Sequence, residues 1–215
     1  MSTRSGPVGV FGGTFDPVHN GHLRSALELV ELLQLDHLRL MPCAQPPHGK
    51  TPAVAAGHRA AMVELAVRDE PRLSCDAREL GRSGASYTVD SLLELRGELG
   101  ESASLCLVMG GDAVAHLDSW NRWEQLGELA HIVVLARPGW QLPESGVVAD
   151  WLRQHAVPDA AELGLRPAGA VLVERLRQLP ISSTEIRQML AAGRSPRYLL
   201  PAPVLDYIQD NQLYL

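Results

Sequence analysis

Two histidines that follow a pair of glycines give the chain its clearest chemical pattern. The stretch Gly12–Leu23 reads GGTFDPVHNGHL and places His19 and His22 three residues apart. Gly12 and Gly13 have no Cβ and can adopt positive φ, so main-chain N–H groups can come close to a phosphate. Imidazoles at this spacing on the first turn of a helix face the same way. Two histidines at helical spacing can be surface residues or a chance metal pair, and two glycines before a helix are common in α/β proteins. Together, however, the glycines, the turn and the histidines predict a site for a nucleotide.

A second cluster of anion-binding side chains lies far downstream. Leu179–Leu190 reads LPISSTEIRQML, in which Ser182 or Ser183 is the expected N-cap and Glu185 occupies the position of a capping-box partner. Arg187, one turn into this helix, can reach back and bind phosphate oxygens in a bidentate manner. This cluster offers more hydrogen-bond donors than a cap requires, so it predicts a second contact to phosphate.

Apolar runs and helical periods alternate along the chain and predict an α/β fold in one domain. The expected strands are Val8–Phe11, His37–Met41, Arg72–Glu79, Ser104–Met109, His131–Ala136 and Ala170–Val173. The expected helices are one carrying Leu23, Ala26 and Val30, then Ala56–Val67, one capped by Ser86 or Thr88 with Leu92, Leu93, Leu95 and Leu99 on its buried side, Asp150–His155, the serine-capped helix, and Pro201–Asn211.

Two loops at the ends of predicted strands carry further candidates, because ligands of parallel sheets bind at the carboxyl ends of the strands. The proline-rich loop AQPPHGKTP holds His48 and Lys50, which either reach a phosphate or serve solubility. Gly110, Gly111 and Asp112 repeat the glycine pair of the first strand. Asp112 is expected to accept hydrogen bonds from a ribose or to cap a helix. For the nearby Trp123, a core position is the expectation.

Composition narrows the class of protein. The chain has 215 residues and a net charge of −6 with dispersed basic residues, which argues against a nucleic-acid groove or an anionic membrane surface. Three cysteines without CxxC spacing are typical of reduced core thiols in a cytoplasmic protein. No apolar run approaches the length of a membrane span. We expect Trp140–Gly169 to be a surface excursion without chemistry.

The motifs resemble those of a known family. GGTFDPVHNGHL and ISSTEIR resemble both signature motifs of the nucleotidyltransferase superfamily. SYTVDSL at Ser86–Leu92, GGD at Gly110–Asp112, Trp120 eight residues later and ARPG at Ala136–Gly139 make nearly the whole chain similar to bacterial nicotinate-nucleotide adenylyltransferases. The resemblance implies a doubly wound, Rossmann-like parallel sheet in a single domain, 1–215. Within it, 140–169 is a variable excursion and 179–215 a C-terminal helical portion.

The resemblance also implies a reaction and the residues that perform it. Family members form deamido-NAD and pyrophosphate from ATP and nicotinate mononucleotide, with magnesium. The catalytic residues implied are His19, His22 and Arg187. The implied ATP contacts are Gly12, Gly13, Thr14, Phe15, His22, Gly110, Asp112, Arg137, Ser182, Ser183 and Arg187. The implied nicotinate-mononucleotide contacts are His19, His48, Lys50, Ser86, Tyr87, Thr88 and Trp120, with Trp120 stacked on the pyridine ring and N–H groups around Tyr87 meeting its carboxylate.

The chemistry that these residue types support is direct displacement at the α-phosphorus, which needs positioning and hydrogen-bond donors but no covalent nucleophile. No cluster of protein ligands for a metal is evident, as expected if Mg²⁺ is carried by the phosphates of ATP. Three alternatives stay open: an adenylyltransferase for nicotinamide mononucleotide, one for phosphopantetheine, and a nucleotide sensor without turnover. The sequence allows a homo-oligomer and leaves the oligomeric state open.

Overall fold

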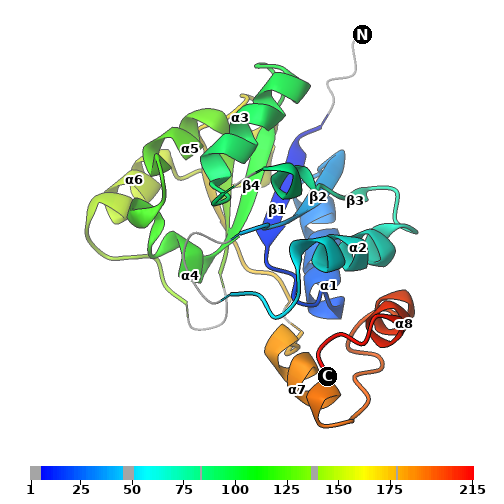
Figure 1. Cartoon of the computed structure of the whole chain (residues 1–215). Coiled ribbons are helices and arrows are strands. Elements are labelled where there is room, and N and C mark those ends of the chain that lie inside the picture. The colour runs from blue at the N-terminus through cyan, green and yellow to red at the C-terminus, as the bar shows by residue number, and fades with distance from the viewer. Residues whose placement is uncertain (1–5, 46–50, 83, 137–139, 178) are drawn as a thin grey trace. The chain divides into compact units, whose positions relative to one another are not determined.

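Strands and helices alternate along the chain (Figure 1), which we describe from a computed structural model over residues 6–45, 51–82, 84–136, 140–177 and 179–215. The strands are β1 Val8–Gly13, β2 His37–Pro42, β3 Leu73–Cys75, β4 Leu105–Gly110, β5 His131–Leu135 and β6 Val171–Glu174. The α-helices are α1 Asn20–Leu32, α2 Ala56–Val67, α3 Thr88–Leu99, α4 Gly111–Val114, α5 Trp123–Leu129, α6 Val147–His155, α7 Ser183–Ala191 and α8 Ala202–Asp210. Short 3₁₀ turns are η1 Arg78–Gly81, η2 Leu117–Ser119 and η3 Ala160–Gly164.

The six strands form one sheet in the order β3-β2-β1-β4-β5-β6. The pairs β1–β4, β4–β5 and β5–β6 are parallel, with Val10 opposite Leu107 and Val108 opposite Val133. This strand order is that of a doubly wound α/β fold, in which the chain reverses its direction of winding between β1 and β4. The predicted fold class is therefore confirmed.

Contacts divide the chain into two compact units. The first unit holds Met1–Phe11, Glu28–Leu38 and Tyr87–Leu176, and the second holds Gly12–Leu27, Arg39–Ser86 and Arg177–Leu215. The boundary falls inside β1, directly before the two glycines. The predicted single-domain organisation stays a prediction.

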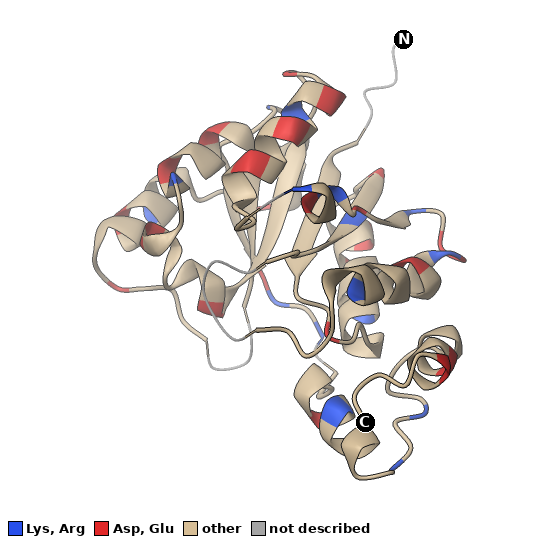
Figure 2. Ribbon diagram, viewed as in Figure 1, with Lys and Arg blue, Asp and Glu red and all other residues tan. Residues whose placement is uncertain are grey.

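In the first unit, α3 and α5 pack together beside the apolar strands β4 and β5. Arg96 of α3 links this helix to neighbouring segments, because its guanidinium donates to the carbonyl oxygens of Leu129, Ala103 and Pro167 at 2.6, 2.5 and 2.6 Å. Acidic residues follow the length of α3, as the red bands in Figure 2 show. The apolar side of this unit's helices faces the sheet, and the charged side is left to solvent.

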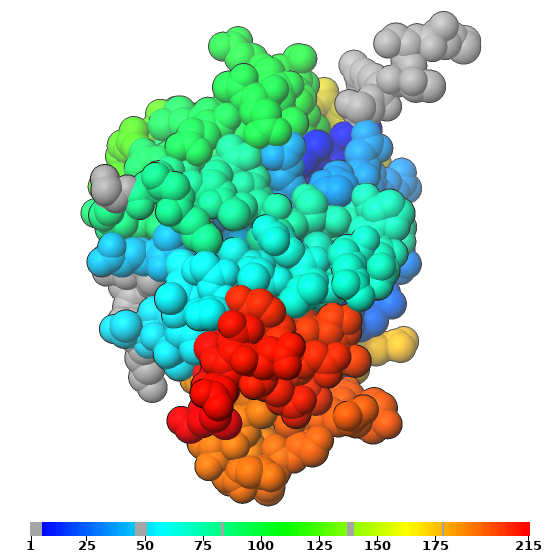
Figure 3. Space-filling view, turned by 45° about the vertical axis from the view of Figure 1, so that its right-hand side comes forward, coloured from blue at the N-terminus to red at the C-terminus, as the bar shows by residue number. Residues whose placement is uncertain are grey.

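In the second unit, α2 packs against both β3 and α8. Figure 3 shows α8, in red, lying against the cyan surface of α2. The hydroxyl of Tyr207 in α8 lies 2.9 Å from Nδ1 of His58 in α2. Val204, Leu205 and Ile208 of α8 are buried, so this terminal helix is held by its apolar face together with one polar contact.

Several element boundaries differ from the prediction. The strand predicted over Arg72–Glu79 is confined to β3, because the Asp76 carboxylate is bound by the Arg78 guanidinium at 2.7 Å and the chain turns there into η1. Neither Ser86 nor Thr88 caps α3, whose N-cap is Tyr87 without a side-chain hydrogen bond. Leu92 and Leu95 are buried as predicted, whereas Leu93 is exposed. Helix α2 matches its predicted bounds.

The excursion Trp140–Gly169 contains more structure than predicted. Helix α6 begins at Val147, ahead of the predicted start at Asp150, and η3 follows it. The indole of Trp151 occupies the space beside Gly127, where an added Cβ would lie 2.5 Å from the ring. Among the described residues, no helix has the length and apolar character needed to cross a membrane.

His131 predicts a pH dependence of stability. Its ring is buried, with Nδ1 accepting from the Ala170 N–H at 3.0 Å and Nε2 lying 2.9 Å from the Arg166 carbonyl oxygen. Burial lowers the pKa of His131 below its usual 6.5. Below pH 6.5 the unfolded chain therefore binds more protons at this residue than the folded chain does. The contribution of neutral His131 to the free energy of unfolding is complete above pH 6.5 and is lost as the pH falls, by up to about 1.4 kcal/mol per pH unit.

Urea unfolding of wild type and His131→Asn between pH 5 and pH 7.5 measures this contribution. The variant should show a shallower pH dependence than wild type, whereas His116→Asn, at an exposed position, should follow wild type. Identical slopes for wild type and His131→Asn would contradict the assignment.

Candidate active site

The glycine pair continues β1 instead of forming a left-handed turn. Gly12 and Gly13 belong to the strand and neither has a positive φ, so the expected use of positive φ is wrong. The left-handed residue is Phe15, with φ of 48°. An added Cβ on Gly13 would lie 2.9 Å from the Phe15 ring, whereas one on Gly12 would meet no atom within 4 Å. Gly13 is thus required for packing, and Gly12 leaves its main chain open to a close approach.

The two histidines of the motif face the same way, as predicted. Their rings are stacked with centroids 3.7 Å apart. The His19 main-chain N–H donates to His22 Nδ1 at 3.3 Å. Because Nδ1 accepts, the neutral His22 ring carries its proton on Nε2 and can donate from there. The contact with His19 therefore selects the tautomer of His22.

His19 itself is buried and neutral. Its side chain is 5% exposed, and burial lowers the pKa of its imidazole to about 4. Its Nδ1 is buried without a hydrogen-bond partner within the described part of the chain, which is uncommon for a ring nitrogen in a folded protein. A Cβ on Gly21 would lie 3.0 Å from the His19 ring. The glycine of the HNGH motif thus makes room for this imidazole.

Helix α7 is bound directly to the turn that precedes the histidines. Ser182 caps the helix as predicted, accepting from the Glu185 N–H at 3.1 Å. The Ser183 hydroxyl donates to the Pro17 carbonyl oxygen at 2.9 Å, and Arg187 Nη1 donates to the Asp16 carbonyl oxygen at 2.6 Å. The structure therefore brings the two predicted motifs together, although they lie 166 to 171 residues apart in the chain.

Arg59 is a structural residue of the site that sequence reasoning missed. It is 1% exposed, and its guanidinium donates to the carbonyl oxygens of Thr14 at 2.7 Å, Ala44 at 3.1 Å and Val54 at 3.3 Å. Burial lowers its pKa, but a guanidinium stays charged in proteins. A single arginine on the buried side of the apolar helix Ala56–Val67 was the available signal.

In the first unit, the GGD motif begins α4. Gly110 is the N-cap, and Asp112 lies exposed in the first turn of the helix. The Trp140 indole covers Gly111 so closely that an added Cβ would lie 2.3 Å from the ring. Trp140, to which the sequence assigned no chemistry, therefore lies directly on a motif residue.

The residues predicted to meet the second substrate lie around the start of α3 and after η2. Tyr87 and Thr88 begin α3, and Trp120, half-buried, follows η2. The Ser86 N–H and hydroxyl are both engaged by Gln45, at 3.0 and 3.3 Å. The first N–H groups of α3 have no side-chain cap and are suited to an anion. Three further predicted residues, His48, Lys50 and Arg137, lie outside the described residues.

The cysteines do not supply a nucleophile. Cys43, Cys75 and Cys106 are all free. Burial raises the pKa of these thiols to about 11, 12 and 12. A thiol with so high a pKa has almost no thiolate at neutral pH, which supports their interpretation as small packing residues.

Comparison with known proteins first gives the class. A family model described as cytidylyltransferase-like matches residues 10–189. A structure of the Plasmodium falciparum nicotinic acid mononucleotide adenylyltransferase, complexed with NaAD, superposes with a TM-score of 0.69 over 97% of this chain and 97% of that one, at 18% identity. At that identity the superposition supports the fold alone. The chain thus belongs to the class that the cytidylyltransferase-like family model describes.

Closer relatives define the family within this class. The chain is 51% identical to a probable nicotinate-nucleotide adenylyltransferase of Cellvibrio japonicus, over 96% of this chain and 98% of the relative. It is 46% identical to a probable enzyme of the same name from Hahella chejuensis, over 97% and 95% of the two chains. The chain belongs to the nicotinate-nucleotide adenylyltransferase family.

The two glycines of β1 predict opposite responses to alanine. Gly13→Ala places a methyl group against the Phe15 ring and should lower the free energy of unfolding by about 1–3 kcal/mol through overpacking. Gly12→Ala has open space for its Cβ and should change that free energy by less than about 0.5 kcal/mol. Denaturant unfolding of both variants tests this, and equal destabilisation would refute the packing role of Gly13.

Proposed function

We propose that this chain transfers the adenylyl group of ATP to nicotinate mononucleotide, giving deamido-NAD and pyrophosphate. Membership of the family supports the reaction. The observation that carries the proposal is the direct binding of helix α7 to the turn before the histidines, through Arg187 and Ser183. This arrangement gathers side chains of both motifs around one stretch of main chain. Arg187 has further N–H donors beyond the one used on Asp16, which supports binding of a phosphate.

The proposed step is an in-line displacement. The phosphate of nicotinate mononucleotide is already ionised at neutral pH, so it attacks the α-phosphorus of ATP without a general base. The bond from the α-phosphorus to the bridging oxygen breaks, and pyrophosphate leaves with the electron pair. The work of the protein is then positioning and stabilisation of charge in the transition state.

Each residue of the glycine-histidine motif has a distinct part in this proposal. Gly12 lets the main chain approach a phosphate, and His22, with its proton on Nε2, donates to an oxygen on the α-phosphorus. His19, neutral because burial lowers its pKa, orients His22 and contributes no positive charge. Ser182, Ser183 and Arg187 hold the triphosphate, with Arg187 supplying the cation. The remaining assigned ATP contacts are Gly13, Thr14, Phe15, Gly110, Asp112 and Arg137.

Magnesium enters the proposal with ATP. Among the described residues, no group of three or more His, Cys, Asp or Glu side chains is suited to a metal. We assign Mg²⁺ to the phosphate oxygens of ATP and to water, which are ligands that this ion prefers. Carried by ATP, the ion would supply positive charge to the leaving pyrophosphate. Three free thiols support a reducing compartment, and we propose the cytoplasm.

The acceptor pocket is assigned to the start of α3. N–H groups there, at Tyr87 and Thr88, offer donors and the positive end of a helix dipole, which suit the carboxylate of nicotinate. The amide of nicotinamide would turn its own donors toward these N–H groups and leave them unpaired. Trp120 stacks on either ring. His19, His48, Lys50 and Ser86 complete the assigned contacts, although the Ser86 N–H is bound to Gln45.

This pocket predicts strong preference for the acid over the amide. Pyrophosphate release from ATP is measured side by side with nicotinate mononucleotide, nicotinamide mononucleotide and 4′-phosphopantetheine. Turnover should occur with the first substrate, at a kcat/KM at least about 100-fold above the others, because unpaired buried donors discriminate strongly. Trp120→Ala should lower kcat/KM for both mononucleotides by a similar factor.

The alternatives give different results in the same assay. Equal use of the acid and the amide by wild type would refute the pocket at α3, and selective use of phosphopantetheine would place the chain among enzymes for that acceptor. ATP binding without pyrophosphate release from any acceptor would identify a sensor.

His22→Ala tests the catalytic assignment. Loss of one preorganised donor to the transition state should lower kcat by about 10²–10³-fold, while the KM for ATP changes only a few-fold, because the triphosphate contacts of α7 stay in place. Steady-state kinetics with His116→Ala as control, at an exposed position outside the motifs, checks this. A wild-type kcat in His22→Ala would remove the residue from the mechanism.

A further inference from the structure

Asp16, in the turn before the histidines, receives hydrogen bonds from three separate segments of the second unit. Asp16 is 6% exposed, and its Oδ2 accepts from the Ala53 N–H at 2.7 Å. Its Oδ1 accepts from the Tyr214 hydroxyl at 2.7 Å, across 198 positions of sequence. Its main-chain carbonyl accepts from Arg187. The turn is therefore positioned by contacts that converge on one residue.

The segment after α8 takes an unfavourable backbone conformation in making this contact. Gln212 and Tyr214 have positive φ angles of 52° and 63°, which are uncommon for residues with a side chain and costly for an aromatic one. Leu213 between them is 9% exposed and anchors the segment by burial. Burial raises the pKa of the Tyr214 hydroxyl, so it stays protonated and able to donate throughout the neutral range.

Arg187 lies within reach of the carboxylate that the Tyr214 hydroxyl binds. Arg187 Nη1 donates to the Asp16 carbonyl oxygen and lies 3.9 Å from the Asp16 carboxylate oxygen Oδ2. A buried carboxylate that loses one of its donors must find another, because an unsatisfied buried charge is costly. Two guanidinium groups face this carboxylate: Arg59 is held by three carbonyl oxygens, whereas Arg187 lies within ion-pair distance. A guanidinium drawn onto the carboxylate offers less to a phosphate.

We propose that Tyr214 is a positioning residue for the triphosphate site: its hydroxyl satisfies the Asp16 carboxylate, so that Arg187 remains directed to ATP. The inference rests on the proposed function for the identity of ATP and extends it to a residue outside both motifs. It explains why the chain after α8 turns back toward the Asp16–Pro17 turn in a strained conformation.

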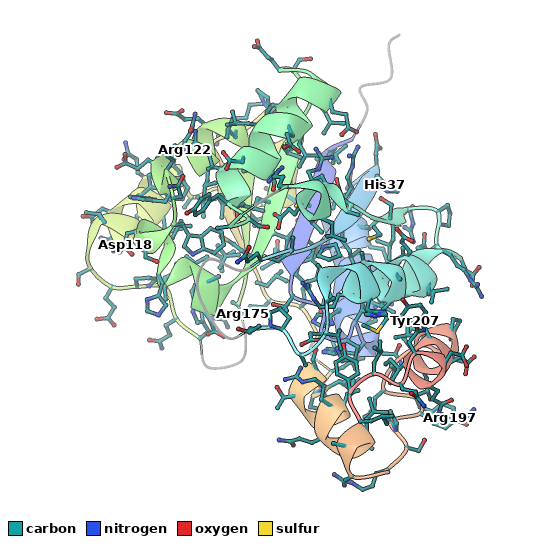
Figure 4. The ribbon with its side chains drawn as sticks, in the orientation of Figure 1. His37, Asp118, Arg122, Arg175, Arg197 and Tyr207 are labelled. Atoms are coloured by element: carbon teal, nitrogen blue, oxygen red, sulfur yellow. The ribbon has the colours of Figure 1, made fainter. Side chains whose placement is uncertain are left out.

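The test compares two tyrosine-to-phenylalanine variants. Tyr207 is labelled on α8 in Figure 4 and makes a hydrogen bond of similar length to His58 of α2, so Tyr207→Phe is the matched control for loss of a structural hydroxyl. Dissociation constants for ATP with Mg²⁺ are measured by calorimetry, together with kcat, both KM values and melting temperatures. Tyr214→Phe should weaken ATP binding and raise the KM for ATP by about tenfold, with the KM for nicotinate mononucleotide within twofold of wild type.

The control separates positioning from stability. Tyr207→Phe should lower the melting temperature about as much as Tyr214→Phe while binding ATP as wild type does. Unchanged ATP affinity in Tyr214→Phe, or equal weakening in both variants, would overturn the proposal.

A second variant tests the competition for Arg187. Adding Asp16→Asn to Tyr214→Phe removes the negative charge that attracts the guanidinium, and should bring ATP affinity back toward wild type. A double variant that binds ATP no better than Tyr214→Phe would refute this cause. Because calorimetry needs no turnover, failure of wild type to form deamido-NAD would count against the proposed function alone.

Discussion

The candidate site depends on how the main chain of one turn is held. The carbonyl oxygens of Thr14 and Asp16 lie outside any strand or helix, and each accepts from a guanidinium, Arg59 for the first at 2.7 Å and Arg187 for the second at 2.6 Å. Buried main-chain groups must be paired, and a guanidinium can pair with a carbonyl that no neighbouring strand reaches. The two arginines come from helices far apart in sequence. The turn that leads into the histidines is consequently fixed by tertiary contacts, and its geometry depends on both helices being folded.

Glycines in the motifs serve two purposes that sequence alone does not separate. At Gly13, Gly21 and Gly111 the missing Cβ makes room for a ring, of Phe15, His19 and Trp140 in turn. At Gly12 the space is open. A motif glycine is thus more often required by aromatic packing in this chain than by the approach of a ligand. Because Gly21 has no Cβ, the His19 ring can lie against it, and there it stacks on the His22 ring.

Local sequence patterns predicted most helices and strands well, but they could not predict contacts between segments far apart in the chain. The bounds of α2 and the Ser182 cap of α7 follow from periodicity and capping chemistry, which involve residues a few positions apart. The role of Arg59 and the bond from Tyr214 to Asp16 join segments 45 and 198 positions apart, and no spacing rule contains that information. Where the local prediction failed, as at the short strand β3, a side-chain pair competed with the strand, because Arg78 binds the Asp76 carboxylate and the chain turns.

The charge of the site has to be local. The whole chain carries a net charge of −6, so its long-range field repels a triphosphate, and attraction must come from groups within a few ångströms. Burial removes His19 as a source of positive charge by lowering its pKa to about 4. Arg187 is then the cation that the paired motifs contribute. How strongly its guanidinium binds an anion depends on which other acceptors it is bonded to. A buried Asp16 beside it is tolerable only while other donors satisfy that carboxylate. Under the proposed function, the binding of phosphate and the hydrogen bonds that hold the turn therefore depend on the same residues, Asp16 and Arg187.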